Sequence, residues 1–219
     1  MCLLMCLPFL AAGCAHRDGG SDAKVLPEGV GGSIVVIGFQ PVLLPGSRPG
    51  MVRNPLTGAF HYAEPVPREV ADKLSQTLLG HLTRSSRYQF VSPGEVEPHN
   101  SSIDSPLRRG GDLDLYARIA GSLSADAFLA GYIWRWKDRK GAELAVESPA
   151  SVDFHLYLIR LADRAIVWEY EYDKTQQSLT ENVLDIKTFL RAKGRWLSAS
   201  ELAELGLEEL AEVFPKKGD

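Results

Sequence analysis

The feature that most limits how this chain can fold is a run of three strand patterns joined by short turns. Residues 127–137, 151–161 and 165–172 alternate along the sequence between two sets of side chains, and the segments 138–141 and 162–164 carry turn-forming residues. Alternation with a period of two is typical of strands. Strands that follow one another with short connections predict an antiparallel meander.

Helix and strand patterns on either side of the meander complete the predicted fold. Two short apolar segments are typical of strands, and four segments have helical periodicity or a capping-box sequence at their start. The strands are 33–39 and 88–91, and the helices are 67–87, 112–124, about 179–192 and 199–214. The predicted order is β-α-β-α-β-β-β-α-α. It corresponds to an α/β fold with a mixed sheet of about five strands packed against helices.

A proline- and glycine-rich stretch, 40–67, separates the first strand from the first helix. Its composition leaves little room for regular structure beyond a short hairpin at Thr57-Gly58. Long connections in compact domains are often functional. We therefore expect a partner-binding surface here, and the alternative is an ordered loop that only covers the edge of the sheet. The candidate residues in this stretch are Arg53, Pro55, Phe60 and Tyr62.

The N-terminal segment is organised like a signal peptide. Residues 1–12 hold an uncharged apolar run, shorter than the roughly 20 residues that a membrane span needs. Small residues then lead to Gly13 and Cys14, and this sequence resembles the lipobox of bacterial lipoproteins. The resemblance implies cleavage between Gly13 and Cys14 and attachment of palmitate-type acyl chains to Cys14. The alternative is a buried apolar segment with an incidental cysteine.

The resemblance to a lipobox predicts three parts of the chain: a signal peptide (1–13), a lipid anchor with a flexible polar tether (14–32) and a single periplasmic α/β domain (33–219). The residue after Cys14 is not Asp but Ala15. By resemblance to enteric lipoproteins, this implies an outer-membrane location. No cysteine follows Cys14, so the domain can contain neither a disulfide nor a thiolate site. A net charge of -4 argues against nucleic acid as a partner.

Two motifs in the meander resemble those of a group of envelope lipoproteins. Residues 125–133 (ADAFLAGYI) are similar to a strand of the CsgG-like curli-secretion and LpoB-like group, whose domains also resemble the TolB N-terminal domain. Residues 159–168 (IRLADRAIVW) are similar to a hairpin of the same group, although Arg164-Ala165 replaces its common Thr-Gly. The resemblance implies a non-enzymatic assembly component that binds other envelope proteins, and it is compatible with a homo-oligomer.

The sequence does not contain the spacing of a known metal or catalytic motif. Ser151, Asp153 and His155 share one strand face, which is too cramped for a nucleophile, a base and its orienting group. We therefore predict no catalytic, metal or cofactor site. The alternative is an envelope hydrolase that uses His155 and Asp153.

Aromatic residues along the meander predict an aromatic sheet face. Most of it is expected to be core, because these side chains have a large area to bury. Trp134 and Trp136, beside Arg135 and Lys137, are further candidates for partner contact. A third hypothesis is a small-ligand module, which an apolar pocket between this face and the 41–67 loop would favour. The aromatic residues are Phe128, Tyr132, Trp134, Trp136, Trp168, Tyr170 and Tyr172.

Overall fold

The computed structural model describes residue 30 and residues 32–91, 112–142, 146–177 and 195–216. The predicted signal peptide with Gly13, the lipidation site Cys14 and the predicted helix at 179–192 lie outside these residues and stay predictions.

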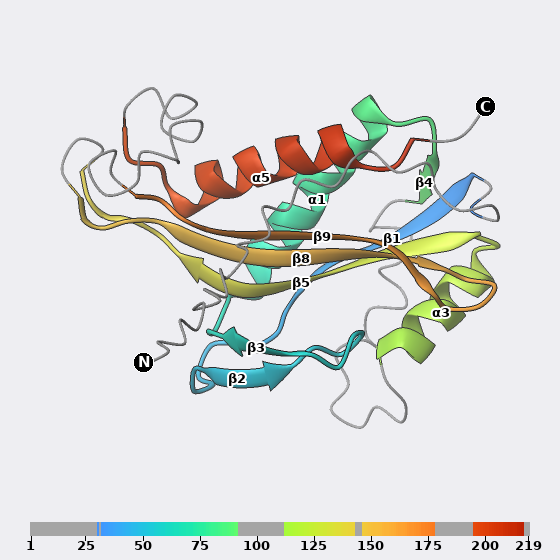
Figure 1. Cartoon of the computed structure of the whole chain (residues 1–219), viewed down its shortest axis with the longest axis horizontal. Helices are drawn as coiled ribbons and strands as arrows, with labels where there is room; N and C mark the ends of the chain where they lie inside the picture. Colours follow the sequence, from blue (N-terminus) through green and yellow to red (C-terminus); the bar gives the residue numbers. More distant parts are fainter. Residues whose placement is uncertain (1–29, 31, 92–111, 143–145, 178–194, 217–219) are drawn as a thin grey trace, which may run out of the picture.

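A five-stranded mixed sheet forms the centre of the molecule (Figure 1). Its strand order is β4-β1-β5-β8-β9. β1 pairs in parallel with β4 and β5, whereas β5, β8 and β9 form an antiparallel meander. The strands are β1 (Ser33–Pro41), β4 (Gln89–Val91), β5 (Ala127–Lys137), β8 (Ser151–Arg160) and β9 (Ile166–Thr175). The predicted fold class is confirmed.

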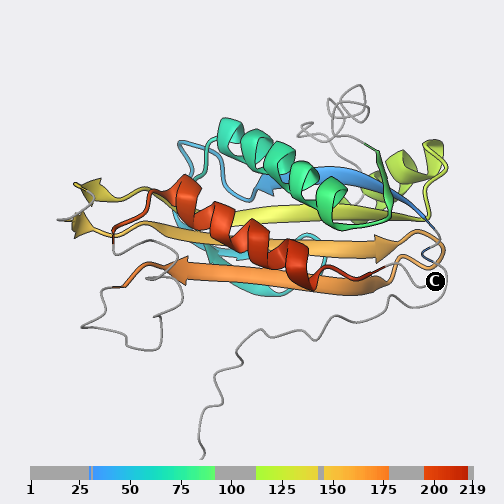
Figure 2. The same ribbon diagram turned by 90° about the horizontal axis from the view of Figure 1, so that it is seen from above.

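Different elements pack on the two faces of the sheet. Helices α1 (Arg68–Ser85) and α5 (Ala199–Val213) lie side by side over one face (Figure 2). Helix α3 (Asp112–Ser122) and the hairpin of β2 (Gly50–Arg53) and β3 (Phe60–Ala63) cover the other face. The capping box predicted at the start of the last helix is present.

The connection between β5 and β8 is longer than the turn predicted at 138–141. It forms a separate two-stranded ribbon of β6 (Lys140–Gly141) and β7 (Val146–Ser148). The chain therefore continues past the predicted turn before it returns to the sheet as β8. The sequence did not predict this ribbon, because its strands are too short to show an alternating pattern of side chains.

A bulge in β5 divides the aromatic residues between the two faces. The pairing of β5 with β8 shifts between Ile133 and Arg135, and an extra residue in one strand reverses the alternation of side chains beyond it. Trp134 consequently lies in the core under the hairpin, whereas Trp136 packs on the helix side. The prediction of one aromatic face is wrong. Phe128, Tyr132 and Trp134 lie on the hairpin side, and Trp136, Trp168, Tyr170 and Tyr172 lie on the helix side.

Candidate interaction surface

The outer face of the β2–β3 hairpin exposes a group of large apolar side chains. Met51 pairs across the hairpin with Tyr62, and Arg53 pairs with Phe60. Because alternate residues point to opposite faces of a strand, all four side chains share the outer face. Met51 is 63% exposed, Phe60 65% and Tyr62 51%. Met51 was not predicted from the sequence, although its spacing from Arg53 places both on one face.

The turn of the hairpin is tied to β8 by a buried amide. Asn54 is 1% exposed. Its Oδ1 accepts hydrogen bonds from the backbone N–H groups of Leu56 (2.9 Å) and Thr57 (3.2 Å), and its Nδ2 donates to the Tyr157 hydroxyl (2.8 Å). Gly58 has a φ of 76°, which favours glycine at this point of the turn. The amide of Asn54 thus orders the turn and fixes it to the sheet.

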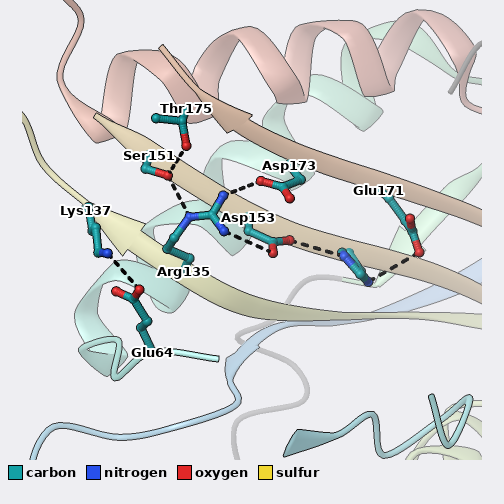
Figure 3. Close-up of polar contacts among 9 residues, drawn as sticks. Glu64, Arg135, Lys137, Ser151, Asp153, Glu171, Asp173 and Thr175 are labelled. Atoms are coloured by element: carbon teal, nitrogen blue, oxygen red, sulfur yellow. Dashed lines mark hydrogen bonds and ion pairs between the residues drawn. The ribbon is translucent and has the colours of Figure 1, made fainter. Parts of the chain in front are cut away.

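The inner face of the hairpin packs directly on the sheet. The His61 ring lies 4.8 Å, between centroids, from the rings of both Trp134 and His155. Just after the hairpin, the backbone N–H of Glu64 donates to the carbonyl of Trp134 (2.7 Å). The Glu64 carboxylate pairs with the ammonium of Lys137 at 2.7 Å (Figure 3). The stretch therefore covers a face of the sheet, not its edge, and presents its outer side chains from a fixed base.

A polar cluster on β8 lies next to the hairpin. The Tyr157 hydroxyl is 3.2 Å from His155 Nδ1, and His155 Nε2 is 3.2 Å from Asp153 Oδ1. The guanidinium of Arg135 reaches Asp153 (3.8 Å) and hydrogen-bonds to Asp173 (Figure 3). Burial raises the pKa of the Tyr157 hydroxyl well above its usual range, and therefore keeps this group protonated.

The cluster is arranged to hold the sheet together. A hydrolytic triad would place the Ser151 hydroxyl beside His155, but this hydroxyl instead accepts a hydrogen bond from Arg135 Nε (2.6 Å) and pairs with Thr175 (2.6 Å). His155 is 4% exposed and Asp153 is 7% exposed. Their contacts thus join β5, β8 and β9.

The structure places the predicted partner-binding residues in three different locations. Arg53, Phe60 and Tyr62 lie together on the outer face of the hairpin, and Pro55 is exposed in its turn. Trp134 is 0% exposed and belongs to the core, so it is not a surface residue. Trp136 is partly buried and faces the other side of the sheet.

A groove of about 520 Å³ runs between α1 and α5, on the face of the sheet opposite the hairpin. Trp136 lines it together with Val70 and Leu74, and its rim carries Glu69 and Lys73. A smaller hollow of about 250 Å³ lies within the hairpin turn. The larger of these two cavities therefore does not lie between the sheet and the 41–67 loop, the position that would have favoured the small-ligand hypothesis as first stated.

In the part of the chain that the structure describes, no helix is both long and apolar enough to cross a lipid bilayer. Among the same residues, no cluster of three or more His, Cys, Asp or Glu side chains could hold a metal ion.

The solved structures that resemble this one include a lipoprotein. No protein-family model and no curated protein matches the sequence. The PelC dodecamer from Paraburkholderia phytofirmans is 11% identical, with a TM-score of 0.47 over 89% of this chain and 96% of that one. The LpoB C-terminal domain from Escherichia coli is 16% identical, with a TM-score of 0.39 over 72% and 89%. Lipoprotein GNA1162 from Neisseria meningitidis is 12% identical, with a TM-score of 0.38 over 74% and 98%. Similarity at this level carries no further conclusion about this chain.

Proposed function

We propose that this chain is a non-enzymatic outer-membrane lipoprotein whose periplasmic domain binds other envelope proteins through the outer face of the hairpin. The observation that carries the proposal is the exposure of Met51, Phe60 and Tyr62 beside Arg53 on one small, firmly attached surface. Aromatic residues, Met and Arg are enriched at protein interfaces. Grouped exposed apolar side chains mark interaction sites more often than single ones do.

The anchor half of the proposal rests on the sequence around Cys14. Cleavage before this residue and its lipidation would leave residues 14–29 as a tether between the membrane and Val30, which is buried in the core under α1 and α5. Such a segment extends to at most about 60 Å, at roughly 3.3–3.6 Å per residue. The tether would let the hairpin reach a partner at some distance from the membrane surface.

A second candidate function is the binding of a small amphipathic molecule in the groove between α1 and α5. The groove has the volume of a typical ligand site, and Val70, Leu74 and Trp136 give it an apolar lining beside charged groups. Titration of the protein with an environment-sensitive apolar dye tests this candidate. Trp136→Ala should weaken dye binding, and Phe60→Ser should leave it unchanged.

The hairpin assignment is tested by site-specific photocrosslinking in intact cells. A photoreactive amino acid at Phe60 or Tyr62 should give a discrete adduct with an envelope protein. The same amino acid at Thr83, an exposed residue of α1 on the opposite side of the sheet, is the control and should give none. Adducts of equal yield at all three positions, or at none, would reject the hairpin as the interface.

The anchor assignment is tested by the intact mass and membrane partition of the wild type and of Cys14→Ala. The wild type should gain the mass of the acyl chains and enter the outer-membrane fraction, because each buried methylene contributes about 0.8 kcal/mol to membrane binding. Cys14→Ala should do neither. Equal behaviour of the two proteins would reject lipidation at Cys14.

A further inference from the structure

β9 is the last strand of the five-stranded sheet within the described residues. Its backbone hydrogen bonds to β8 reveal which groups face outward. The N–H of Gln176 donates to the carbonyl of Ala150 at 3.0 Å, and Thr175 is paired with Ser151. In an antiparallel pair, hydrogen-bonded and non-hydrogen-bonded residue pairs alternate. The backbone N–H and C=O groups of residues 169, 171, 173 and 175 therefore point away from β8.

The residues whose backbone faces outward also carry the exposed charges of the strand. Glu169, Glu171 and Asp173 alternate with the buried residues Tyr170 and Tyr172. The side chain of Glu171 is 58% exposed and that of Asp173 is 63% exposed. Asp173 already pairs with the guanidinium of Arg135. Glu171 also lies 3.6 Å from Nδ1 of His155, but its side chain stays exposed, so Glu169 and Glu171 supply most of the available negative charge. Within the described residues, the backbone groups that have no strand partner and a row of carboxylates thus lie along the same edge.

We propose that the outer edge of β9 binds an extended, basic segment of another protein by strand addition. The backbone of the segment would pair with residues 169, 171, 173 and 175. Lys or Arg side chains at alternate positions, about 6.8 Å apart along a strand, would lie opposite Glu169 and Glu171. Main-chain pairing gives such complexes affinity, and the alternating side chains give them specificity.

The same charges argue against a second copy of this chain as the occupant. Pairing of two β9 edges would set carboxylates against carboxylates, and like charges directly opposite each other are destabilising. Charged edge strands commonly prevent self-association in this way. A basic segment would remove the repulsion and use the exposed edge. This surface is separate from the hairpin, so either assignment can fail without the other.

The test uses the full-length protein in detergent and fluorescently labelled peptides of about eight residues, a usual strand length. One peptide alternates Lys and Thr, a second alternates Glu and Thr, and a third is the Lys–Thr peptide with N-methyl groups on its β9-facing amides. Fluorescence anisotropy should show saturable binding of the first peptide. The other two should bind at least about tenfold more weakly, a difference of about 1.4 kcal/mol.

Variants of β9 separate backbone pairing from charge. Glu171→Pro removes an outward-facing donor together with a carboxylate and leaves pairing with β8 intact, as proline on an edge strand can. It should weaken binding of the Lys–Thr peptide more than Glu171→Gln, which removes only the charge. The double variant Glu169→Lys/Glu171→Lys should reverse the preference between the basic and acidic peptides. The double variant Glu208→Lys/Glu209→Lys, at two exposed carboxylates on α5, is the charge-matched control and should change neither. Circular dichroism confirms that each variant is folded.

Three results would overturn the proposal. The first is no binding of the Lys–Thr peptide to the wild type, and the second is equal binding of its N-methylated form. The third is a loss of binding in Glu208→Lys/Glu209→Lys as large as in the β9 variants. The second result would indicate attraction by charge alone, and the third would indicate a response to the overall charge of the domain.

Discussion

Gly206 lies where α5 rests on β9, and only a hydrogen fits at its side-chain position. A Cβ at this residue would be 2.8 Å from ring atoms of Tyr172, whose hydroxyl donates to the carbonyl of Leu202 (3.0 Å). The close approach of helix and ring thus depends on glycine.

We expect Gly206→Ala to lower the free energy of unfolding by about 1–3 kcal/mol, as overpacking does, although alanine is favoured in helices by about 1 kcal/mol. Gly80→Ala on α1 is the matched control, since its nearest neighbour is the flexible Arg84 side chain at 3.6 Å. It should raise the free energy of unfolding by up to about 1 kcal/mol. Urea denaturation measures both, and equal effects of the two substitutions would show that α5 does not pack this closely.

The guanidinium of Arg135 lies between two carboxylates on neighbouring strands of the meander. Asp153 and Asp173 are directly paired in β8 and β9, and the Arg135 guanidinium contacts both. Without this cation, the buried Asp153 would lose its main compensating charge.

Arg135→Met should therefore reduce the free energy of unfolding by about 3 kcal/mol, the lower end for breaking a buried ion pair, because Asp173 is exposed. Adding Asp153→Asn should restore part of the loss. Lys137→Met removes an exposed partner of Glu64 and should change stability by at most about 1 kcal/mol. Chemical denaturation of the three variants checks this, and a full loss that persists with Asp153→Asn would contradict the role given to Arg135.

At the scale of the element, α5 begins at a capping box that an ion pair reinforces. The Ser198 hydroxyl accepts from the N–H of Glu201 (3.2 Å), and the Glu201 carboxylate accepts from the N–H of Ser198 (2.8 Å). The Arg195 guanidinium is 2.7 Å from the same carboxylate. The bond from Arg195, and next the backbone bond from Ser198, lower the pKa of Glu201 to about 2.

This lowered pKa makes the start of α5 sensitive to acid. A carboxyl group with a depressed pKa in the folded state stabilises the fold above its unfolded pKa of about 4.3, and this stabilisation is lost as the pH falls toward 2. The stability difference between wild type and Glu201→Gln should be complete above about pH 5 and should shrink on acidification. Urea denaturation between pH 3 and pH 7 measures it, and a difference independent of pH would contradict the assignment. Ser198→Ala should cost about 1 kcal/mol at neutral pH.

At the scale of the whole molecule, the sheet has a hydrophobic core on each of its two faces. The helix-side core contains Trp168, and the hairpin-side core contains Trp134. Strands β5 and β8 contribute side chains to both cores, so neither core can lose its packing without disturbing the other.

The two cores should therefore unfold in a single transition, as in most small domains. Two variants test this, each with three of the four tryptophans replaced by Phe so that only Trp134 or only Trp168 remains. In each variant, the fluorescence midpoint in urea should coincide with the midpoint from far-UV circular dichroism. A Trp134 transition at clearly lower urea would show that the hairpin side opens on its own.

The sequence by itself determined the order of the main helices and strands in the described part of the chain, but not the short β6–β7 ribbon. Alternation predicted the meander, helical periodicity predicted α1 and α3, and Ser198 with Glu201 predicted the start of α5, because these signals arise between residues close in the chain. It also placed Arg53 and Phe60 in a candidate surface, since the polar turn at Thr57-Gly58 fixes a hairpin locally.

Only the tertiary structure decided which side chains are available at a surface. The bulge after Ile133 sends Trp134 and Trp136 to opposite faces, and one inserted residue leaves no mark in the composition of a strand. The contact of Asn54 with Tyr157, which fixes the hairpin turn, joins residues 103 positions apart. The position of β9 at the edge of the sheet likewise follows from the pairing of the other strands. Such features depend on which distant segments meet, and local sequence patterns do not encode that choice.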